Sequence, residues 1–269
     1  MPELPEVETV ARGLHKRLAG DRIREVWIGP HKKLLLSTPR QMEKVLTGAR
    51  IMGFRRVGKH IVGTLETSVG TAQWVIHLGM TGRCLVYEAA EVVEKHTHLV
   101  VTLDSGREMR YVDPRRFGKL KVLTQGEFHA AGAEPLGADP EQFYERFHRR
   151  KTPIKSALLN QTLLTGLGNI YADESLFRAG VRPRRRADRV TRQEYARLYE
   201  GIQQVLTEAI AAGGSSVSDY VGASGERGFF QLQHRVYQRT GQPCLVCGAE
   251  IQRVVIGGRS SHYCPHCQR

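Results

Sequence analysis

The sequence has no long apolar run, no secretory signal and a shortage of acidic residues. No stretch of eighteen apolar residues is present, so we expect no transmembrane helix. The chain opens MPELPEVETV, with acidic residues where a signal peptide carries basic and then apolar ones, so we expect a cytoplasmic protein. Hydrophobic residues make up 41% of the 269 positions, which favours a globular protein over a disordered one.

The shortage of acidic residues is concentrated in the second half. The chain has 40 Lys+Arg against 27 Asp+Glu, a formal charge of +13. Residues 146–192 contain twelve Lys or Arg and three Asp or Glu, and residues 227–269 contain six Arg and one Glu. One explanation is a solvated surface that is kept soluble by its charge, but such a surface does not require the charges to cluster. The clustering predicts a polyanionic partner, most simply nucleic acid.

Four of the five cysteines follow the spacing of a zinc site. Cys244, Cys247, Cys264 and Cys267 read C-x2-C, sixteen residues, C-x2-C. Two disulfides are the alternative, but a cytosolic chain would not keep them. We expect one structural zinc ion per chain, because four thiolates leave no open position for catalysis. The fifth, Cys84, lies in a strand-like run and is predicted to be a buried thiol.

Hydrophobic periodicity predicts an α+β multidomain protein. Residues 5–19 have the pattern of an amphipathic helix, and short β-rich runs follow from Arg22 to Thr124, typical of an antiparallel sandwich or barrel. After Gly126 the pattern becomes helical, with a Gly-rich turn entering a helix that ends at Gly180. A capping box at Thr191 starts a long amphipathic helix.

These patterns predict three domains. The first, residues 1–128, is an N-terminal helix with a β-sandwich. The second, residues 129–230, is a helical domain for gripping duplex DNA and includes a Gly/Ser-rich loop at 215–230. The third, residues 231–269, is a zinc ribbon.

The N-terminus offers one candidate for chemistry. Removal of Met1 before a small residue would expose the secondary amine of Pro2, with Glu3 and Glu6 within reach. An α-amine titrates near pH 8, so a useful fraction is a neutral nucleophile at pH 7. Attack on a sugar anomeric carbon would give an iminium, and a neighbouring carboxylic acid could protonate the sugar oxygen or the leaving group. By itself this segment is more simply explained as a helix lead-in.

Five motifs in order, MPELPEVE, HLGMTG, DPRRFG, GLGNIYADE and CxxC…CxxC, together resemble the formamidopyrimidine-DNA glycosylase family. They run from residue 2 to residue 267. The resemblance implies a helix–two-turns–helix domain. It also implies a bifunctional repair enzyme that removes oxidised purines (8-oxoguanine, formamidopyrimidines) from duplex DNA and nicks the abasic site by β,δ-elimination.

The same resemblance implies roles for particular residues. Pro2 matches the Schiff-base nucleophile, Glu3 the general acid and Glu6 a supporting carboxylate. Lys59 matches a lysine that contacts the target phosphate and assists β-elimination. Arg259 matches a phosphate contact on the ribbon that assists δ-elimination.

Other matched residues are implied to contact DNA. Met80, Arg115 and Phe117 match the wedge that fills the space left by the extruded base, and Arg115 can also bond the orphaned partner base. Further positions match contacts to the DNA backbone: His96, Arg150, Lys155 and Asn169.

The chain departs from the family pattern at three positions. Val217 and Ser218 stand where a Leu and a basic residue are common, and His60 stands where an aromatic residue often follows the lysine. Two alternatives stay open: an endonuclease VIII-like glycosylase for oxidised pyrimidines, and a non-catalytic zinc-ribbon DNA-binding protein. We expect a monomer that binds double-stranded DNA containing an oxidised base or abasic site, and that associates with the nucleoid when bound.

Overall fold

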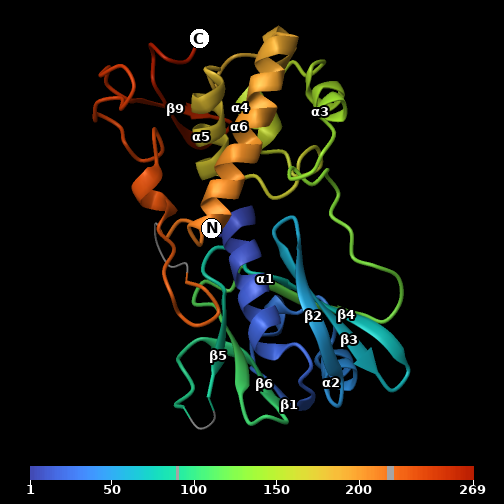
Figure 1. Ribbon diagram of the computed structural model, residues 1–269. Coiled ribbons are helices and arrows are strands. Elements are labelled where there is room, and N and C mark those ends of the chain that lie inside the picture. The colour runs from blue at the N-terminus through green and yellow to red at the C-terminus, as the bar shows by residue number, and fades with distance from the viewer. Residues whose placement is uncertain (89–90, 217–220) are drawn as a thin grey trace. The chain divides into compact units, whose positions relative to one another are not determined.

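The computed structural model describes residues 1–88, 91–216 and 221–269, and the chain divides into two compact units (Figure 1). Unit 1 comprises Met1–His129 and Ala212–Phe229, and unit 2 comprises Ala130–Ala211 and Phe230–Arg269. Across the described ranges, no helix has both the length and the apolar character needed to span a membrane.

Unit 1 starts with helix α1 (Leu4–Leu18), which confirms the helix expected over residues 5–19. Pro5 lies in its first turn, where a missing backbone N–H costs nothing. Its apolar face is fully buried against the sheets, with Val7 and Leu14 both at 0% exposure. The helix therefore extends into the core while its N-terminus carries the candidate catalytic residues.

The β-rich region forms two four-stranded antiparallel sheets, ordered β1-β6-β7-β5 and β2-β3-β4-β8. Apolar side chains from both sheets and from α1 make one core cluster that includes Trp74, Ile61 and Leu99. The predicted β-sandwich is thereby confirmed. Its strands are β1 (Ile23–Ile28), β2 (Arg50–Val57), β3 (His60–Thr67), β4 (Gly70–His77), β5 (Arg83–Tyr87), β6 (Thr97–Leu103), β7 (Glu108–Val112) and β8 (Lys119–Leu123).

A short helix, α2 (Pro39–Leu46), interrupts the region expected to contain only strands. Thr38 caps it: the Thr38 hydroxyl accepts a hydrogen bond from the Gln41 N–H at 3.2 Å, and Gln41 bonds back to the Thr38 N–H. Proline follows at the first helical position. This capping box was the sequence signal that the strand-based interpretation missed. The single-turn 3-10 helix Lys32–Leu34 precedes it.

Residues 212–216 and 221–229, grouped above with the helical segment, belong to unit 1. The Ala223 carbonyl accepts the Val86 N–H at 2.9 Å, and Ser224 accepts a hydrogen bond from Arg17 at 2.7 Å. A Cβ added to Gly13 would lie 2.9 Å from the Ala223 side chain, so the segment lies directly against α1. The departures noted at Val217 and Ser218 fall outside the described residues.

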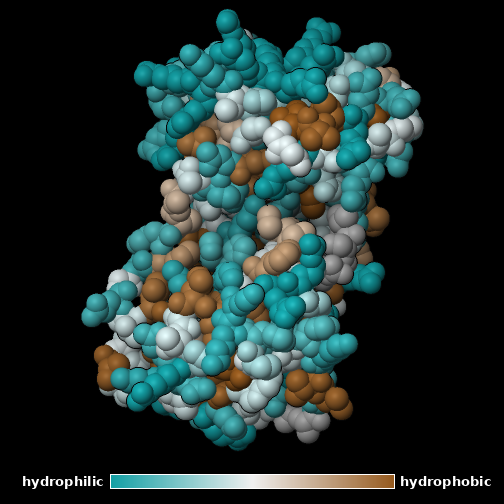
Figure 2. Space-filling view, turned by 180° about the vertical axis from the view of Figure 1, so that it is seen from behind, coloured by the Kyte–Doolittle hydropathy of each residue, from teal (hydrophilic) through white to brown (hydrophobic). Residues whose placement is uncertain are grey.

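Unit 2 contains the predicted helices and the ribbon. Gly180 ends α5 in the left-handed region (φ 71°), and Thr191 and Glu194 form the expected capping box. Over unit 2 (upper part of Figure 2), the visible face is mostly hydrophilic, with small separate hydrophobic groups. The elements are α3 (Pro140–Phe147), α4 (Ile154–Leu158), α5 (Asn169–Ala179), α6 (Arg192–Ala211), β9 (Gln252–Ile256), β10 (Arg259–Tyr263) and the 3-10 helices Ala187–Arg189 and Phe230–Gln233.

Candidate active site, wedge turns and metal centre

The N-terminal residues are buried and held by one carboxylate. Glu3 and Glu6 are 3% and 2% exposed, and Pro2 is also buried. Glu6 Oε2 accepts the Glu3 N–H at 2.8 Å, and Glu6 Oε1 accepts the Ser215 N–H at 2.7 Å. Both oxygens of Glu6 are therefore used to fix backbone, one at the start of α1 and one in the segment 212–229.

Gly214 allows this approach. Its φ is +83°, and a Cβ there would lie 2.8 Å from Glu6 Oε1. Any other residue would push the carboxylate away from the Ser215 N–H. The geometry brings together Pro2, Glu3 and Glu6, as the sequence predicted, and adds Gly214 and Ser215, which the sequence analysis did not single out.

Lys59 lies in the β2–β3 turn beside two imidazoles. Its side chain is 8% exposed, and His60 and His77 are cross-strand partners with ring centroids 4.9 Å apart. His60 also packs on Phe128, with centroids 4.7 Å apart. Burial, followed by the charge of His77, lowers the pKa of His60 to about 4, while burial and then Lys59 lower the pKa of His77. Both imidazoles are thus neutral at pH 7 beside the lysine.

The wedge turns, residues 78–82 between β4 and β5 and residues 113–118 between β7 and β8, are locked together by Asp113. Its Oδ1 accepts the Thr81 hydroxyl at 2.6 Å and its Oδ2 accepts the Gly118 N–H at 2.9 Å. The Thr81 oxygen accepts the Arg115 N–H at 3.2 Å. A Cβ on Gly79 would lie 2.5 Å from Gly118 N, so the two backbones touch. Asp113 is fully buried, and the sequence analysis did not single it out.

The three predicted wedge residues lie on these turns and are exposed. Met80 is 38% exposed and Phe117 is 52% exposed. The Arg115 guanidinium carbon lies 4.9 Å from the Phe117 ring centroid, a cation–π arrangement. His96 is also exposed. It lies close to these turns, because its carbonyl accepts the Asp113 N–H at 3.0 Å. Two apolar side chains and one planar cation therefore project from a rigid base.

In unit 2 the predicted DNA-contact residues differ in exposure. Arg150 follows α3 and is exposed, and Arg259 is exposed at the first position of β10. Asn169, the first residue of α5, is half-buried. Lys155 is 0% exposed and pairs with Asp173, which is also 0% exposed, at 2.7 Å. The expected phosphate contact of Lys155 is therefore corrected: its ammonium lies in an internal ion pair.

The four cysteines of the ribbon converge. All four Sγ atoms lie within 4.8 Å of one another, with Cys244–Cys267 at 3.8 Å and Cys247–Cys264 at 3.4 Å. Zn–S bonds of about 2.3 Å in a tetrahedron imply S···S distances near 3.8 Å, so the donor set fits zinc. Among the described residues, these cysteines form the one cluster of three or more His, Cys, Asp or Glu side chains close enough together to hold a metal ion. Cys84, in β5, is 1% exposed, and burial raises the pKa of its thiol.

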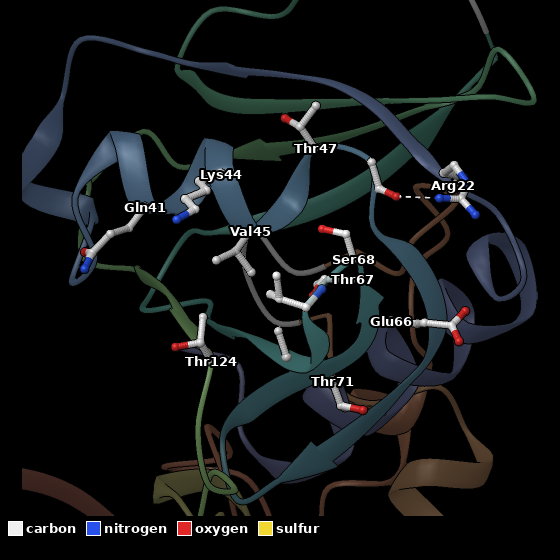
Figure 3. Close-up of a pocket in the computed structure, with 13 residues that line it drawn as sticks. Arg22, Gln41, Lys44, Val45, Thr47, Glu66, Thr67, Ser68, Thr71 and Thr124 are labelled. Atoms are coloured by element: carbon white, nitrogen blue, oxygen red, sulfur yellow. Dashed lines mark hydrogen bonds between the residues drawn. The ribbon is translucent and has the colours of Figure 1, made fainter.

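A separate cavity of about 800 Å³ lies in unit 1 between α2 and the β3–β4 turn (Figure 3). Polar side chains surround it, including Arg22, Lys44 and Glu66, and Arg22 donates to the Gly48 carbonyl at its rim. None of the predicted site residues lines it. The candidate site therefore does not coincide with this cavity and consists of the buried and exposed side chains above.

Comparisons with known proteins cover the whole chain. Family models match for the formamidopyrimidine-DNA glycosylase N-terminal domain (residues 1–120), its H2TH domain (132–221) and a zinc finger found in FPG and IleRS (241–269). Proteins named formamidopyrimidine-DNA glycosylase from Solibacter usitatus and Gluconobacter oxydans are 48% and 44% identical, with complete coverage of both chains.

Solved structures of similar sequence share the fold over nearly the whole chain. The Lactococcus lactis Fpg bound to abasic-site DNA has a TM-score of 0.91 at 34% identity and 99% coverage of each chain. MutM bound to DNA containing carbocyclic 8-oxo-G has the same score and identity with 100% coverage of each chain.

The neutral state of His60 predicts a pH dependence of stability. Between about pH 6.5 and pH 4 the unfolded chain binds a proton at this histidine that the folded chain does not, so the free energy of unfolding decreases as the pH falls. His60→Phe keeps the packed ring and removes this proton. We expect a shallower loss of stability in urea unfolding between pH 7 and pH 5.

Substitution of the exposed His129 by Phe is the matched control for loss of a histidine. An identical pH slope for the His60→Phe variant and the parent protein would contradict the buried, neutral imidazole.

Proposed function

The chain belongs to the formamidopyrimidine-DNA glycosylase family, and from that membership we propose that it excises oxidised purines from duplex DNA and nicks the abasic site that results. The observation that carries the proposal is the buried N-terminal group of Pro2, Glu3 and Glu6. A DNA-binding protein without chemistry has no need of two carboxylates buried beside an N-terminal proline.

In this proposal Pro2 is the nucleophile. Once Met1 is removed, its secondary amine attacks C1′ of the damaged nucleotide while the base leaves, and Glu3 supplies a proton. The product is an iminium that links Pro2 to the opened sugar. Glu6 holds the Glu3 backbone through the 2.8 Å hydrogen bond and so sets the direction of the attacking segment.

The iminium then drives strand cleavage. As an electron sink it acidifies the C2′–H bond, and loss of that proton expels the 3′ phosphate, which is β-elimination. Lys59, beside two neutral histidines, is the cation we assign to the target phosphate. A second elimination expels the 5′ phosphate, with Arg259 assigned to assist it, and water then releases Pro2.

The damaged base must leave the stack before C1′ can be attacked, at a cost of a few kcal/mol. We assign Met80, Arg115 and Phe117 to offset this cost by filling the vacated space. This assignment is supported by the exposure of these side chains on the two wedge turns, which Asp113 holds together. Arg115 is the one of the three that can hydrogen-bond the partner base. Backbone contacts are assigned to His96, Arg150 and Asn169.

The zinc ion implied by the family would be held by the four ribbon cysteines and would stabilise the small β9–β10 ribbon rather than react. We further propose a monomer located in the cytoplasm and on the nucleoid when bound to DNA. Two features support this location: the zinc site requires reduced cysteine thiols, and the proposed substrate is DNA.

Covalent trapping tests the nucleophile. Borohydride reduces the iminium, so protein lacking Met1 by intact mass should become cross-linked to lesion DNA through residue 2. Pro2→Gly should lower the trapped yield sharply, and Glu3→Gln should block base release while DNA affinity stays near the parent value. An equally efficient cross-link mapped to Lys59 would overturn the assignment, and no trapping by the parent protein would favour a non-catalytic binding protein.

The wedge is tested by paired substrates. Phe117→Ala should slow single-turnover cleavage of an 8-oxoguanine duplex strongly and that of an abasic duplex much less, because the abasic site has no base to eject. Phe229→Ala removes another exposed aromatic side chain of unit 1 and serves as the control. Equal slowing of both substrates by Phe117→Ala would rule out the wedge role.

A further inference from the structure

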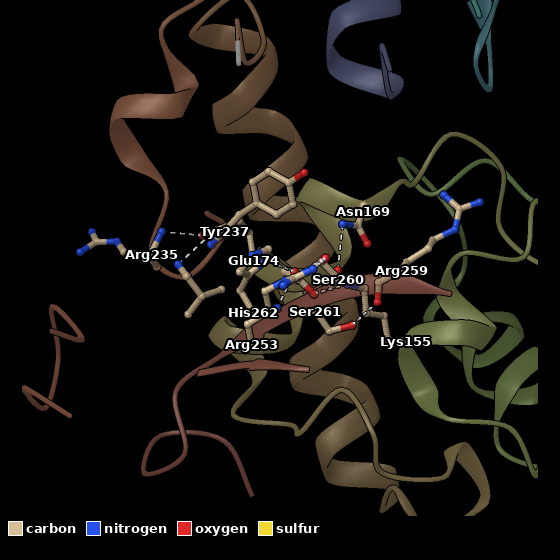
Figure 4. A network of polar contacts seen from close by, with 12 residues as sticks. Lys155, Asn169, Glu174, Arg235, Tyr237, Arg253, Arg259, Ser260, Ser261 and His262 are labelled. Atoms are coloured by element: carbon tan, nitrogen blue, oxygen red, sulfur yellow. Dashed lines mark hydrogen bonds and ion pairs between the residues drawn. The ribbon is translucent and has the colours of Figure 1, made fainter. Parts of the chain in front are cut away.

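A buried ion pair lies beneath the ribbon strand that carries Arg259. The Lys155 ammonium is 2.7 Å from Asp173 Oδ1, and both side chains are 0% exposed. The same ammonium donates to the Ser260 carbonyl at 2.7 Å (Figure 4). Lys155 therefore links helices α4 and α5 to the backbone next to Arg259.

Asp173 holds the same strand at a second point. Its Oδ2 accepts the His262 N–H at 2.9 Å and lies 3.1 Å from His262 Nδ1. Ser260 and His262 are two residues apart on β10, so their backbone groups point to the same edge of this short strand, and Lys155 and Asp173 fix that edge. Neither Asp173 nor His262 was assigned a role above.

The Ser260 carbonyl also joins two residues assigned to DNA. It accepts Asn169 Nδ2 at 3.0 Å, and Asn169 begins α5. Arg259 immediately precedes Ser260, and its side chain extends away from the network (Figure 4). One carbonyl oxygen thus sets the position of Asn169 and of Arg259 relative to each other.

The ribbon needs such support. An isolated two-stranded hairpin is marginally stable, and the β9–β10 turn is formed by Gly257 and Gly258 at φ 54° and 74°. Two successive glycines do not restrict where Arg259 points. A buried ion pair adds little stability over an apolar pair of the same size, but its directed hydrogen bonds select one backbone position.

We propose that Lys155, Asp173 and His262 are positioning residues that aim Arg259 at the second elimination step. The inference rests on the proposed function, because it takes the δ-elimination role of Arg259 from there. In this proposal Lys155 does not contact a DNA phosphate but holds the Ser260 backbone from the interior. The network acts on strand cleavage and leaves base release, which depends on Pro2 and Glu3, unaffected.

The test is the ratio of δ- to β-elimination products on an abasic duplex in a single turnover. The variant is Lys155→Met with Asp173→Asn, which removes both buried charges together and keeps an acceptor for His262. The rate constant of δ-elimination should fall by about tenfold or more, since small misplacements are costly. That of β-elimination should stay within about twofold of the parent, and the salt slope of DNA affinity should fall no further than it does in Arg259→Ala.

Arg259→Ala provides the reference, and adding it to the double variant should cause no further loss of δ-product. An unchanged product ratio in the double variant, or a parallel loss of both products, would overturn the proposal. A salt slope reduced further than in Arg259→Ala alone would do so too, because it would return Lys155 to the phosphates. If the parent protein forms no β-product, the proposed function itself fails instead.

A second pair of variants keeps the test valid if the double variant does not fold. His262→Asn retains a side-chain N–H near the position of Nδ1, whereas His262→Ala removes it. The product ratio should fall for His262→Ala and recover in His262→Asn, and equal ratios for the two would contradict the positioning role.

Discussion

The candidate active site depends on the two hydrogen bonds accepted by Glu6. One oxygen holds the Glu3 N–H and the other holds the Ser215 N–H, at 2.8 and 2.7 Å. A carboxylate that is 2% exposed is costly to bury, and these backbone donors offset the cost. Because Pro2 is attached to Glu3, we expect the direction of the proposed N-terminal amine to depend on this one side chain. The backbone at Ser215 is fixed by the same contact.

Buried acidic residues play the same part elsewhere in the molecule. Asp113 joins the two wedge turns, Asp173 holds β10, and Glu174 accepts three backbone N–H groups, from Arg235, Val236 and Tyr237, at 2.8–3.0 Å. In each case a carboxylate orders a loop or short strand that has little core of its own. The exposed cations and aromatic residues assigned to DNA are thereby carried on backbone with a defined position.

Local signals in the sequence were sufficient for much of this structure. The periodicity of α1, the glycine ending α5 and the spacing of the four cysteines each act over a few residues or through a repeated motif. Helix α2 carried an equally local capping box and was missed because the surrounding strand pattern dominated the interpretation. The motifs also singled out Met80, Arg115 and Phe117, which the structure places on adjoining turns.

The non-local contacts could not be predicted in this way. Lys155 stands in a basic stretch, and its sequence context gives no sign that Asp173, eighteen residues later, neutralises it in the interior. The contact of Ser215 with Glu6 spans 209 positions and depends on the left-handed conformation of Gly214. Such pairs are set by tertiary packing, so composition and spacing place the residues but not their partners.

The central claim is that Glu6 directs the N-terminal amine, and the rate of iminium formation tests it most directly. Abasic DNA removes the need for base ejection, so borohydride trapping over time reports attack by Pro2 alone. For Glu6→Ala in protein lacking Met1, the account predicts a rate constant at least about tenfold below the parent, with DNA affinity unchanged. Glu8→Ala, on the same helix, should trap at the parent rate. Trapping of Glu6→Ala at the parent rate would contradict the account.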